Sequence, residues 1–194
     1  IVALHQGASF QNTDVSFGYG ASGGNLDTRT FVGLVARASD TDPNTFYFVR
    51  HKNQTTPILE IGKSVDGAVT SIATIQEFSF LRPYAMRFRV LQQGSSTTLK
   101  VKIWKTGTAE PNSWALETTD SEARLQSVSG RAGLYTKVHR SSYNNFDDFF
   151  VQDTGPLVFN PSPLNISFPA SATQVGISVS TQETATCRYS KVPD

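Results

Sequence analysis

Short stretches rich in β-branched and aromatic residues recur along residues 1–152, and turn-forming residues such as Asp66-Gly67 separate them. Runs of about 4–8 such residues bounded by turn signals are typical of β-strands. The pattern predicts strands at 1–5, 14–19, 31–37, 45–51, 58–63, 69–75, 84–91, 98–104, 115–119, 132–138 and 145–152. The helix candidate, 121–127, is short. Many strands at this spacing predict an all-β, two-sheet antiparallel sandwich rather than an α/β enzyme fold.

The composition changes at residues 154–163, which contain Gly155-Pro156 and Pro161-Ser162-Pro163. Proline, glycine and serine together are typical of an interdomain linker. We therefore expect a first domain at 1–153, a linker at 154–163 and part of a second domain at 164–194. Three strands are expected in that second part, which is too few for an independently stable sandwich. Those strands are predicted at 166–168, 174–180 and 185–190.

The charge pattern excludes two classes of partner. The chain has 17 basic and 16 acidic residues and no run of lysine or arginine, so we expect no nucleic-acid binding. No apolar run approaches the ~20 residues that cross a bilayer, so we expect no membrane insertion. One methionine and one cysteine in 194 residues suit an exported protein, and we expect an extracellular or cell-surface location.

Four motifs together carry a family resemblance. They are the segments FVGLVARASD at 31–40, KIWK at 102–105, GRAGLY at 130–135 and NFDDFFV at 145–151. They resemble the concanavalin A-like (laminin-G-like) jelly-roll domains of bacterial extracellular proteins. The resemblance implies a jelly-roll sandwich over 1–153. Members usually begin with one further strand, so we expect the first strand of this domain to be missing or supplied by another part of the polypeptide.

The segment Thr-Cys-Arg-Tyr-Ser at 186–190 resembles the opening of a fibronectin type III-like (Ig-like) module. Such a module has about 90–100 residues, so most of it would lie beyond residue 194. The resemblance implies that Cys187 forms a disulfide with a cysteine outside the chain. The alternative is that Cys187 is a free, small hydrophobic residue.

Asp147 and Asp148 are adjacent in the closing strand, between apolar residues. Successive strand residues face opposite sides, so one carboxylate is expected to point toward the sandwich interior or its rim. A carboxylate there needs a cation, an arginine or backbone N–H groups. The resemblance implies a structural Ca²⁺ ion at Asp147 or Asp148, and the alternative is a salt bridge or an edge-strand charge. Residues that point apart do not fit the carboxylate pair of a glycoside hydrolase, whose carboxyl groups lie about 5–10 Å apart across a sugar.

Aromatic and polar residues near the loops are the candidates for ligand binding. Trp104 and Trp114 flank the loop 107–111, where they would either stack on sugar rings or pack the loop onto the sandwich edge. Residues around the polar loop before the closing strand are expected at a solvent-facing rim. These rim candidates are Tyr135, His139, Arg140 and Tyr143.

Tyr47 and His51 complete the set of candidate ligand-binding residues. With Arg50, Arg87 and Arg89 they superficially resemble the tyrosine, histidine and arginine set of jelly-roll polysaccharide lyases.

The sequence leaves three functions open. The first is a noncatalytic carbohydrate-binding or adhesion module of a larger exported multidomain protein. Its partners would be a polysaccharide or glycan, or other protein subunits, beside the flanking domains of the same polypeptide. The alternative is a structural subunit or decoration domain of an extracellular filament, fibre or virion. The third is a polysaccharide lyase or glycoside hydrolase. We expect no organic cofactor.

Overall fold

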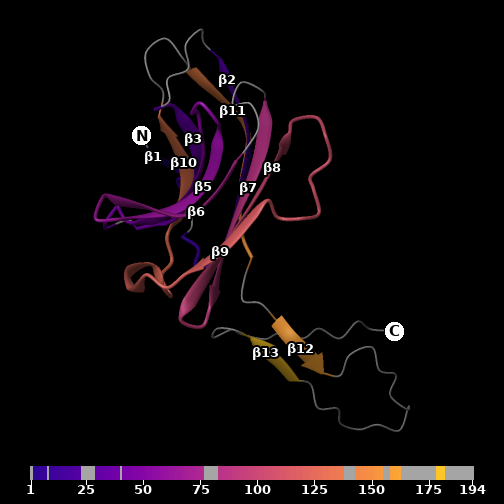
Figure 1. Cartoon of the computed structure of the whole chain (residues 1–194). Coiled ribbons are helices and arrows are strands. Elements are labelled where there is room, and N and C mark those ends of the chain that lie inside the picture. Colours follow the sequence, from indigo (N-terminus) through magenta and orange to yellow (C-terminus); the bar gives the residue numbers. More distant parts are fainter. Residues whose placement is uncertain are drawn as a thin grey trace. The chain divides into compact units, whose positions relative to one another are not determined.

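A computed structural model gives the fold (Figure 1). It describes residues 2–7, 9–22, 29–39, 41–76, 83–137, 143–154, 158–162 and 178–181. The contacts divide the chain into two units, Ile1–Asp153 and Thr154–Asp194. Among the residues described, the helical element is one turn of 3-10 helix, Ala123–Leu125, and no helix is long and apolar enough to cross a membrane.

The first unit consists of two antiparallel sheets. The strand order of one is β1-β10-β3-β4-β5-β6 and of the other β11-β2-β7-β8-β9. The six-stranded sheet contains β1 (Val2–Leu4), β10 (Arg131–Lys137), β3 (Phe31–Ala38), β4 (Phe46–Lys52), β5 (Ile58–Val65) and β6 (Ala68–Gln76). The five-stranded sheet contains β11 (Tyr143–Asp153), β2 (Thr13–Ser22), β7 (Tyr84–Gln93), β8 (Ser96–Lys105) and β9 (Leu116–Asp120). The predicted all-β, two-sheet antiparallel sandwich is confirmed.

The core lies between the two sheets and follows from alternation along the strands. In β7, Met86, Phe88 and Val90 are fully buried, whereas the residues between them are half-buried on the outer face. Leu34 and Ile61 of the opposite sheet belong to the same buried cluster. Because side chains alternate between the faces of a strand, this packing fixes which residues of the five-stranded sheet point outward.

The six-stranded sheet is also packed on its outer side. A second apolar cluster there contains Val35, Phe46 and Phe48, with Tyr135 packed against it. The guanidinium of Arg50 lies 4.8 Å from the ring centre of Phe48 and 5.9 Å from that of Tyr135. Because this sheet is packed on both sides, buried and exposed residues do not alternate along β3, and every residue of β3 is buried.

The second unit is described over two paired strands, β12 (Val158–Ser162) and β13 (Ser178–Thr181). The first of these falls inside the segment predicted as a linker. Pro161 lies at the register shift between Phe159 and Ser162, where a residue without an N–H group is tolerated in a ladder. Cys187 lies outside the described residues, as do the strands predicted at 166–168 and 185–190.

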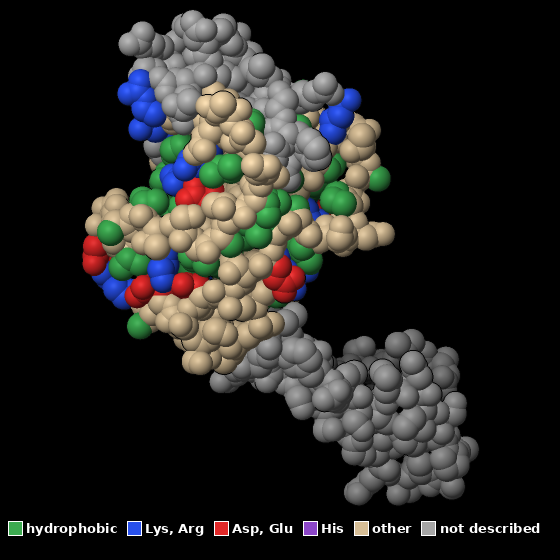
Figure 2. Space-filling view, in the orientation of Figure 1, with side chains coloured by type: hydrophobic (Ala, Val, Ile, Leu, Met, Phe, Trp, Pro, Cys, Tyr) green, Lys and Arg blue, Asp and Glu red, His purple; other side chains and the backbone are tan. Residues whose placement is uncertain are grey.

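Charged side chains of both signs are interspersed on the visible face in Figure 2, where basic and acidic groups lie side by side. Glu60 is the most buried of the described ion-paired glutamates, and its carboxylate accepts a 2.7 Å hydrogen bond from Arg50 Nε. Lys52 Nζ is 3.4 Å away. Burial raises the pKa of Glu60, but Arg50 and Lys52 together outweigh it, so the pKa lies below its usual range.

We expect a Glu60→Gln variant to lose about 1–2 kcal/mol of stability at neutral pH, because the charge-assisted hydrogen bonds become neutral ones. Because the pKa of Glu60 is lower in the folded state, its ionised carboxylate stabilises the fold fully at pH values above the pKa of the unfolded carboxyl, about 4.3. This contribution to stability is lost as the pH falls through the pKa of the folded state. Urea denaturation of both proteins from pH 7 downward should therefore show the difference shrinking below about pH 5. A difference independent of pH would contradict this assignment.

Candidate functional site

The outer face of the five-stranded sheet carries polar and aromatic side chains in register. The inward neighbours Val15 and Phe17 are buried in the core, so the intervening residues of β2 face outward. Paired residues of neighbouring strands share a face. The register therefore aligns three rows on this face: Asp147–Gly18–Ala85–Trp104, Phe150–Ser16–Arg87–Lys102 and Gln152–Asp14–Arg89–Lys100–Glu117.

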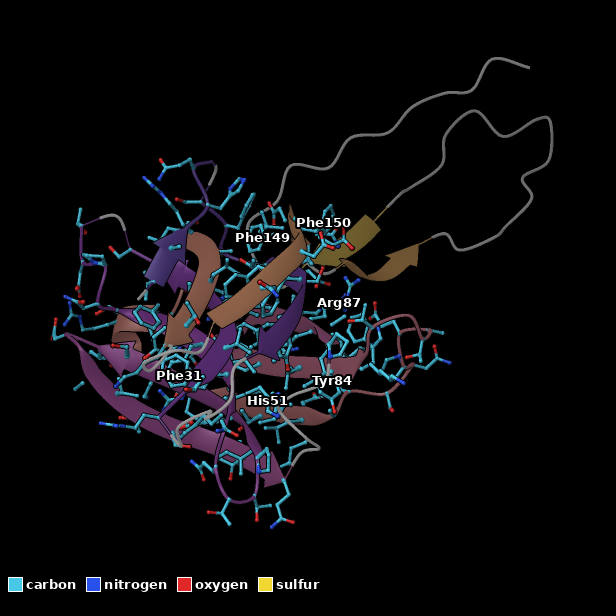
Figure 3. The ribbon with its side chains drawn as sticks, turned by 90° about the horizontal axis from the view of Figure 1, so that it is seen from above. Phe31, His51, Tyr84, Arg87, Phe149 and Phe150 are labelled. Carbon is cyan, nitrogen blue, oxygen red and sulfur yellow. The ribbon has the colours of Figure 1, made fainter. Side chains whose placement is uncertain are left out.

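Asp14 lies on this face, near the start of β2, and is fully buried. Its carboxylate accepts a 2.9 Å hydrogen bond from Arg89 Nε and a 3.3 Å bond from Arg87 Nη1. Arg87 lies on the face of β7 opposite to Tyr84, which points into the core (Figure 3). The buried carboxylate thus fixes two outward-facing guanidinium groups.

The loop between β8 and β9 folds over one part of this face. Glu110 accepts hydrogen bonds from Arg87 Nη2 at 2.9 Å, and Lys102 Nζ lies 3.1 Å from its carboxylate. Burial raises the pKa of Glu110, but Lys102 and Arg87 reverse the effect and lower it. The ring of Trp114 covers Lys102 and Arg89, at 4.9 Å and 5.0 Å from its centre. Trp114 therefore packs the loop onto the sheet.

Beside this loop the face is hollowed into a pocket of about 270 Å³. Trp104 and Gly107 line one side, and Asp148 lines the other. Arg87 also lines the pocket. It combines an aromatic ring with groups that donate and accept hydrogen bonds, the usual character of a small-molecule site.

The closing strand is interrupted where the two aspartates lie. The register with β2 shifts between Asp147 and Phe150, and Asp148 has φ 50°, in the left-handed region. The Asp148 N–H donates to Asp147 Oδ1 at 2.9 Å. Both aspartates are exposed, so neither carboxylate lies in the sandwich interior, which was one of the two positions expected from alternation. A bulge adds a residue to one strand and breaks the two-residue period.

The bulge bears on the predicted calcium ion, since Ca²⁺ takes about 6–8 oxygen ligands. Among the described residues, no group of three or more His, Cys, Asp or Glu side chains could hold a metal ion. Asp147 and Asp148 are thus not part of such a side-chain cluster among the described residues, and the calcium site stays a prediction.

Two of the predicted ligand-binding residues are buried inside the sandwich. The Tyr47 hydroxyl donates to Asp120 Oδ2 at 2.8 Å, and burial raises its pKa. His51 Nδ1 lies 2.7 Å from the Tyr19 hydroxyl. Both side chains are fully buried, so neither is accessible to a ligand in this structure. The prediction that these two residues bind a ligand is therefore wrong, because both side chains point inward from β4.

The residues that resembled a lyase set do not come together. Tyr47 and His51 lie between the sheets, and Arg50 covers aromatic rings on the outer side of the six-stranded sheet. Arg87 and Arg89 lie on the outer face of the other sheet. The five side chains therefore lie in three separate places: the core, the outer side of the six-stranded sheet and the outer face of the five-stranded sheet.

The remaining predicted ligand-binding residues do not form one site among the described residues either. Trp104 lines the pocket, whereas Tyr135 packs against Phe31 with ring centres 4.6 Å apart on the other sheet. Tyr135 is half-buried in this packing, and its place at a solvent-facing rim stays a prediction. Tyr143 is the first residue of β11, and its side chain is not among those described. His139 and Arg140 lie outside the described residues.

Sequence reasoning missed Asp14, Ser16 and Glu110 as parts of this face. Their roles depend on the register between strands that are far apart in the chain, which local patterns do not reveal. One local signal was available: the alternation Ser16-Phe-Gly-Tyr-Gly20 places small residues on the outer face and aromatic ones in the core.

No protein-family model matches the sequence, and no curated protein matches it. Solved structures share the fold. The carbohydrate-binding module CBM66 from Bacillus subtilis has a TM-score of 0.55 and 15% identity, over 75% of this chain and 78% of that one. A xylan beta-1,4-xylosidase from Bacillus halodurans C-125 has a TM-score of 0.53 and 12% identity, over 74% of this chain and 28% of that one. The GH43 protein BlXynB from Bacillus licheniformis has a TM-score of 0.54 and 12% identity, over 73% of this chain and 27% of its own. At such identities the likeness shows the sandwich fold alone.

Proposed function

We propose that the unit Ile1–Asp153 is a noncatalytic carbohydrate-binding or adhesion module of a larger exported protein with further domains. The pocket beside Trp104 on the outer face of the five-stranded sheet would hold the glycan. The observation that carries the proposal is the combination of Trp104, Arg87 and Asp148 around this pocket. The fold shared with a module that is named as carbohydrate-binding supports it.

The chemistry of the pocket suits a hydroxyl-rich ring. An aromatic side chain offers an apolar face for the C–H groups of a sugar. Arg87 donates hydrogen bonds and Asp148 accepts them, so neighbouring hydroxyl groups of one sugar would find both kinds of partner. Asp14 and Glu110 hold Arg87 in place before the ligand arrives, which lowers the entropic cost of binding.

A structural subunit of an extracellular assembly is the alternative. The observation that favours it is on β11, the edge strand of the five-stranded sheet, where Phe150 is 51% exposed and Phe146 37% exposed. An edge strand with exposed aromatic residues is a surface on which another chain can pair or pack.

The test is a glycan array probed with wild-type protein and with a Trp104→Ala variant. We expect Trp104→Ala to weaken binding of the best glycan by about tenfold or more, because aromatic anchors dominate such sites. Tyr135→Ala is the control, since this aromatic residue packs on the other sheet and does not line the pocket, and it should keep the affinity. Equal loss in both variants would move the site elsewhere. Self-association of the wild-type protein without binding to any glycan would favour the structural alternative.

A further inference from the structure

Two glycines, Gly18 and Gly20, lie two residues apart on the outer face of β2. Glycine weakens a strand, because it loses more backbone entropy on folding and has no side chain to pack. Glycines in strands therefore mark a conformational need, a packing need or a place where a ligand approaches closely.

Neither conformation nor packing requires these two glycines. Positive φ angles occur at other glycines, Gly67 among them. A Cβ atom added at Gly18 would lie 3.5 Å from the Asp147 carbonyl oxygen, and one at Gly20 would lie 4.0 Å from Pro83 Cβ, both ordinary contacts. At Gly33, by contrast, an added Cβ would lie 2.0 Å from the Val49 carbonyl oxygen.

The glycines underlie two adjoining pockets. The second pocket has a volume of about 330 Å³ and lies over Gly18 and Gly20, between Pro83 and Asn145. It shares Gly18, Thr106 and Asp148 with the pocket beside Trp104. The two pockets together form a groove along β2, which we call the β2 groove, from Ser16 to Gly20. The four steps from Ser16 to Gly20 along the strand span about 14 Å, longer than one sugar ring.

We propose that the β2 groove binds a neutral oligosaccharide, with one ring beside Trp104 and the next ring over Gly18 and Gly20. This inference rests on the proposed function and adds the length and charge of the ligand. The absence of side chains at the two glycines lets a ring lie close to the backbone, where Ala85 and Ser16 are also small.

The charges of the groove favour a neutral ligand. Asp147 and Asp148 line one wall and would accept hydrogen bonds from hydroxyl groups, whereas they would repel a carboxylated or sulfated sugar. Arg87, the cation that lines the groove, already contacts Asp14 and Glu110, so its charge is offset.

Calorimetric titration with matched pairs of probes tests the inference: xylose and xylotriose, glucose and cellotriose, mannose and mannotriose, with trigalacturonic acid as the anionic probe. We expect the preferred trisaccharide to bind wild-type protein about tenfold or more tightly than its monosaccharide, because a second ring adds contacts. Gly20→Val should remove that difference, and Gly18→Val should weaken both ligands, since Gly18 lines both pockets.

Both variants should melt at or above the wild-type temperature, since valine favours strands and its Cβ atom would make only ordinary contacts at either position. Thr119→Val, on the exposed β9 of the same sheet, is the control and should bind as wild type does. Equal affinity for monosaccharide and trisaccharide, or full trisaccharide affinity in Gly20→Val, would overturn the groove and leave the proposed function standing. Tighter binding of trigalacturonic acid than of any neutral probe would overturn the neutral ligand. Binding of no probe, and of no glycan on the array, would overturn the proposed function itself.

Discussion

Replacing Arg37 by methionine should lower the free energy of unfolding by about 3–5 kcal/mol. Arg37 is 1% exposed, although it lies in a strand otherwise made of apolar and small residues. Its Nε donates to the Gln11 carbonyl oxygen at 2.7 Å, and its Nη1 donates to the Leu125 carbonyl oxygen at 2.6 Å. Nη1 also donates to Gln92 Oε1 at 2.9 Å and to Thr97 Oγ1 at 2.8 Å.

These bonds explain why an apolar residue of similar length is no substitute. Methionine would fill the space but remove the Arg37 donor from the carbonyl groups of Gln11 and Leu125 and from the side-chain oxygens of Gln92 and Thr97. Buried polar groups that lose a donor are costly. Arg37 also has φ 55°, so the chain adopts a backbone conformation that is uncommon for non-glycine residues. Denaturation in urea at neutral pH is the measurement.

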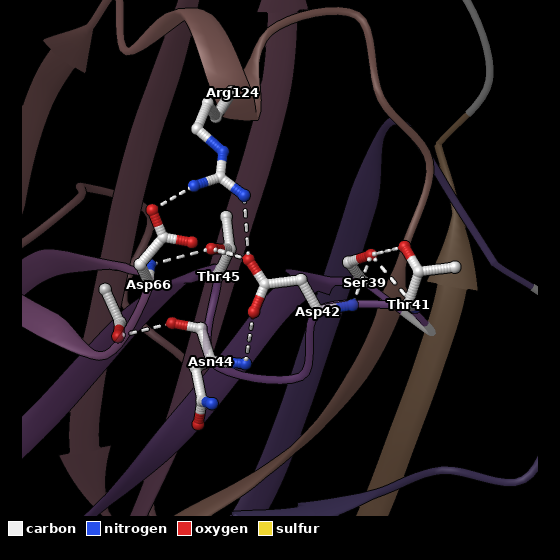
Figure 4. Close-up of polar contacts among 8 residues, drawn as sticks. Ser39, Thr41, Asp42, Asn44, Thr45, Asp66 and Arg124 are labelled. Carbon is white, nitrogen blue, oxygen red and sulfur yellow. Dashed lines mark hydrogen bonds and ion pairs between the residues drawn. The ribbon is translucent and has the colours of Figure 1, made fainter.

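Arg124 supplies the matched control. It also pairs with partners from distant loops, Asp42 at 3.0 Å and Asp66, but it does so at the surface (Figure 4). Water can replace both contacts, so Arg124→Met should change stability far less than Arg37→Met does. Equal effects of the two substitutions would show that burial of the Arg37 network contributes little.

An Asp14→Ala variant should lose about 2–3 kcal/mol of stability. Removing one partner of a buried ion pair leaves the other charge uncompensated. Arg87 and Arg89 keep 23% and 34% of their side-chain surface exposed, so water partly compensates them and the loss stays below that of a fully buried pair. Glu117→Ala, which breaks the exposed pair with Lys100 on the same sheet, should cost less than about 1 kcal/mol.

The Asp14→Ala variant also tests the pocket beside Trp104. Without Asp14, Arg87 loses one of the two carboxylates that orient it, and glycan affinity should fall even under conditions where the protein remains folded. Denaturation curves and glycan titration of Asp14→Ala and Glu117→Ala separate the two effects. A folded Asp14→Ala protein with unchanged glycan affinity would mean that Arg87 does not act in the pocket.

The sandwich was predictable because its signals are local. Alternation in β7 separates core residues from outer ones. The turn residues Asp66 and Gly67 have φ angles of 53° and 83°, as a type I′ hairpin turn requires. Tyr47 and His51 show the limit of that signal. Their polar atoms suggested a binding surface, whereas the Tyr47 hydroxyl bonds to Asp120 and His51 Nδ1 bonds to the Tyr19 hydroxyl inside the core.

The site was less predictable because it depends on long-range register and on a bulge. Nothing in a single sequence states that Asp14 lies beside Arg89, or that the strand period breaks at Asp148. Trp104 was identified by its residue type alone. The glycines of β2 were visible in the sequence, but only the space around them shows that the fold does not need them.

The β2 groove is formed by two strands that lie near opposite ends of the first unit in the sequence. Its floor belongs to β2, while residues 145–148 of its wall belong to β11, which pairs with β2 from the far end of the sequence. Such pairing gives the sandwich a high contact order, and domains of this kind fold slowly, because the chain must close long loops before the contacts form. No partly folded state that lacks β11 contains the groove. A bound sugar would therefore stabilise only those states in which β11 is paired with β2.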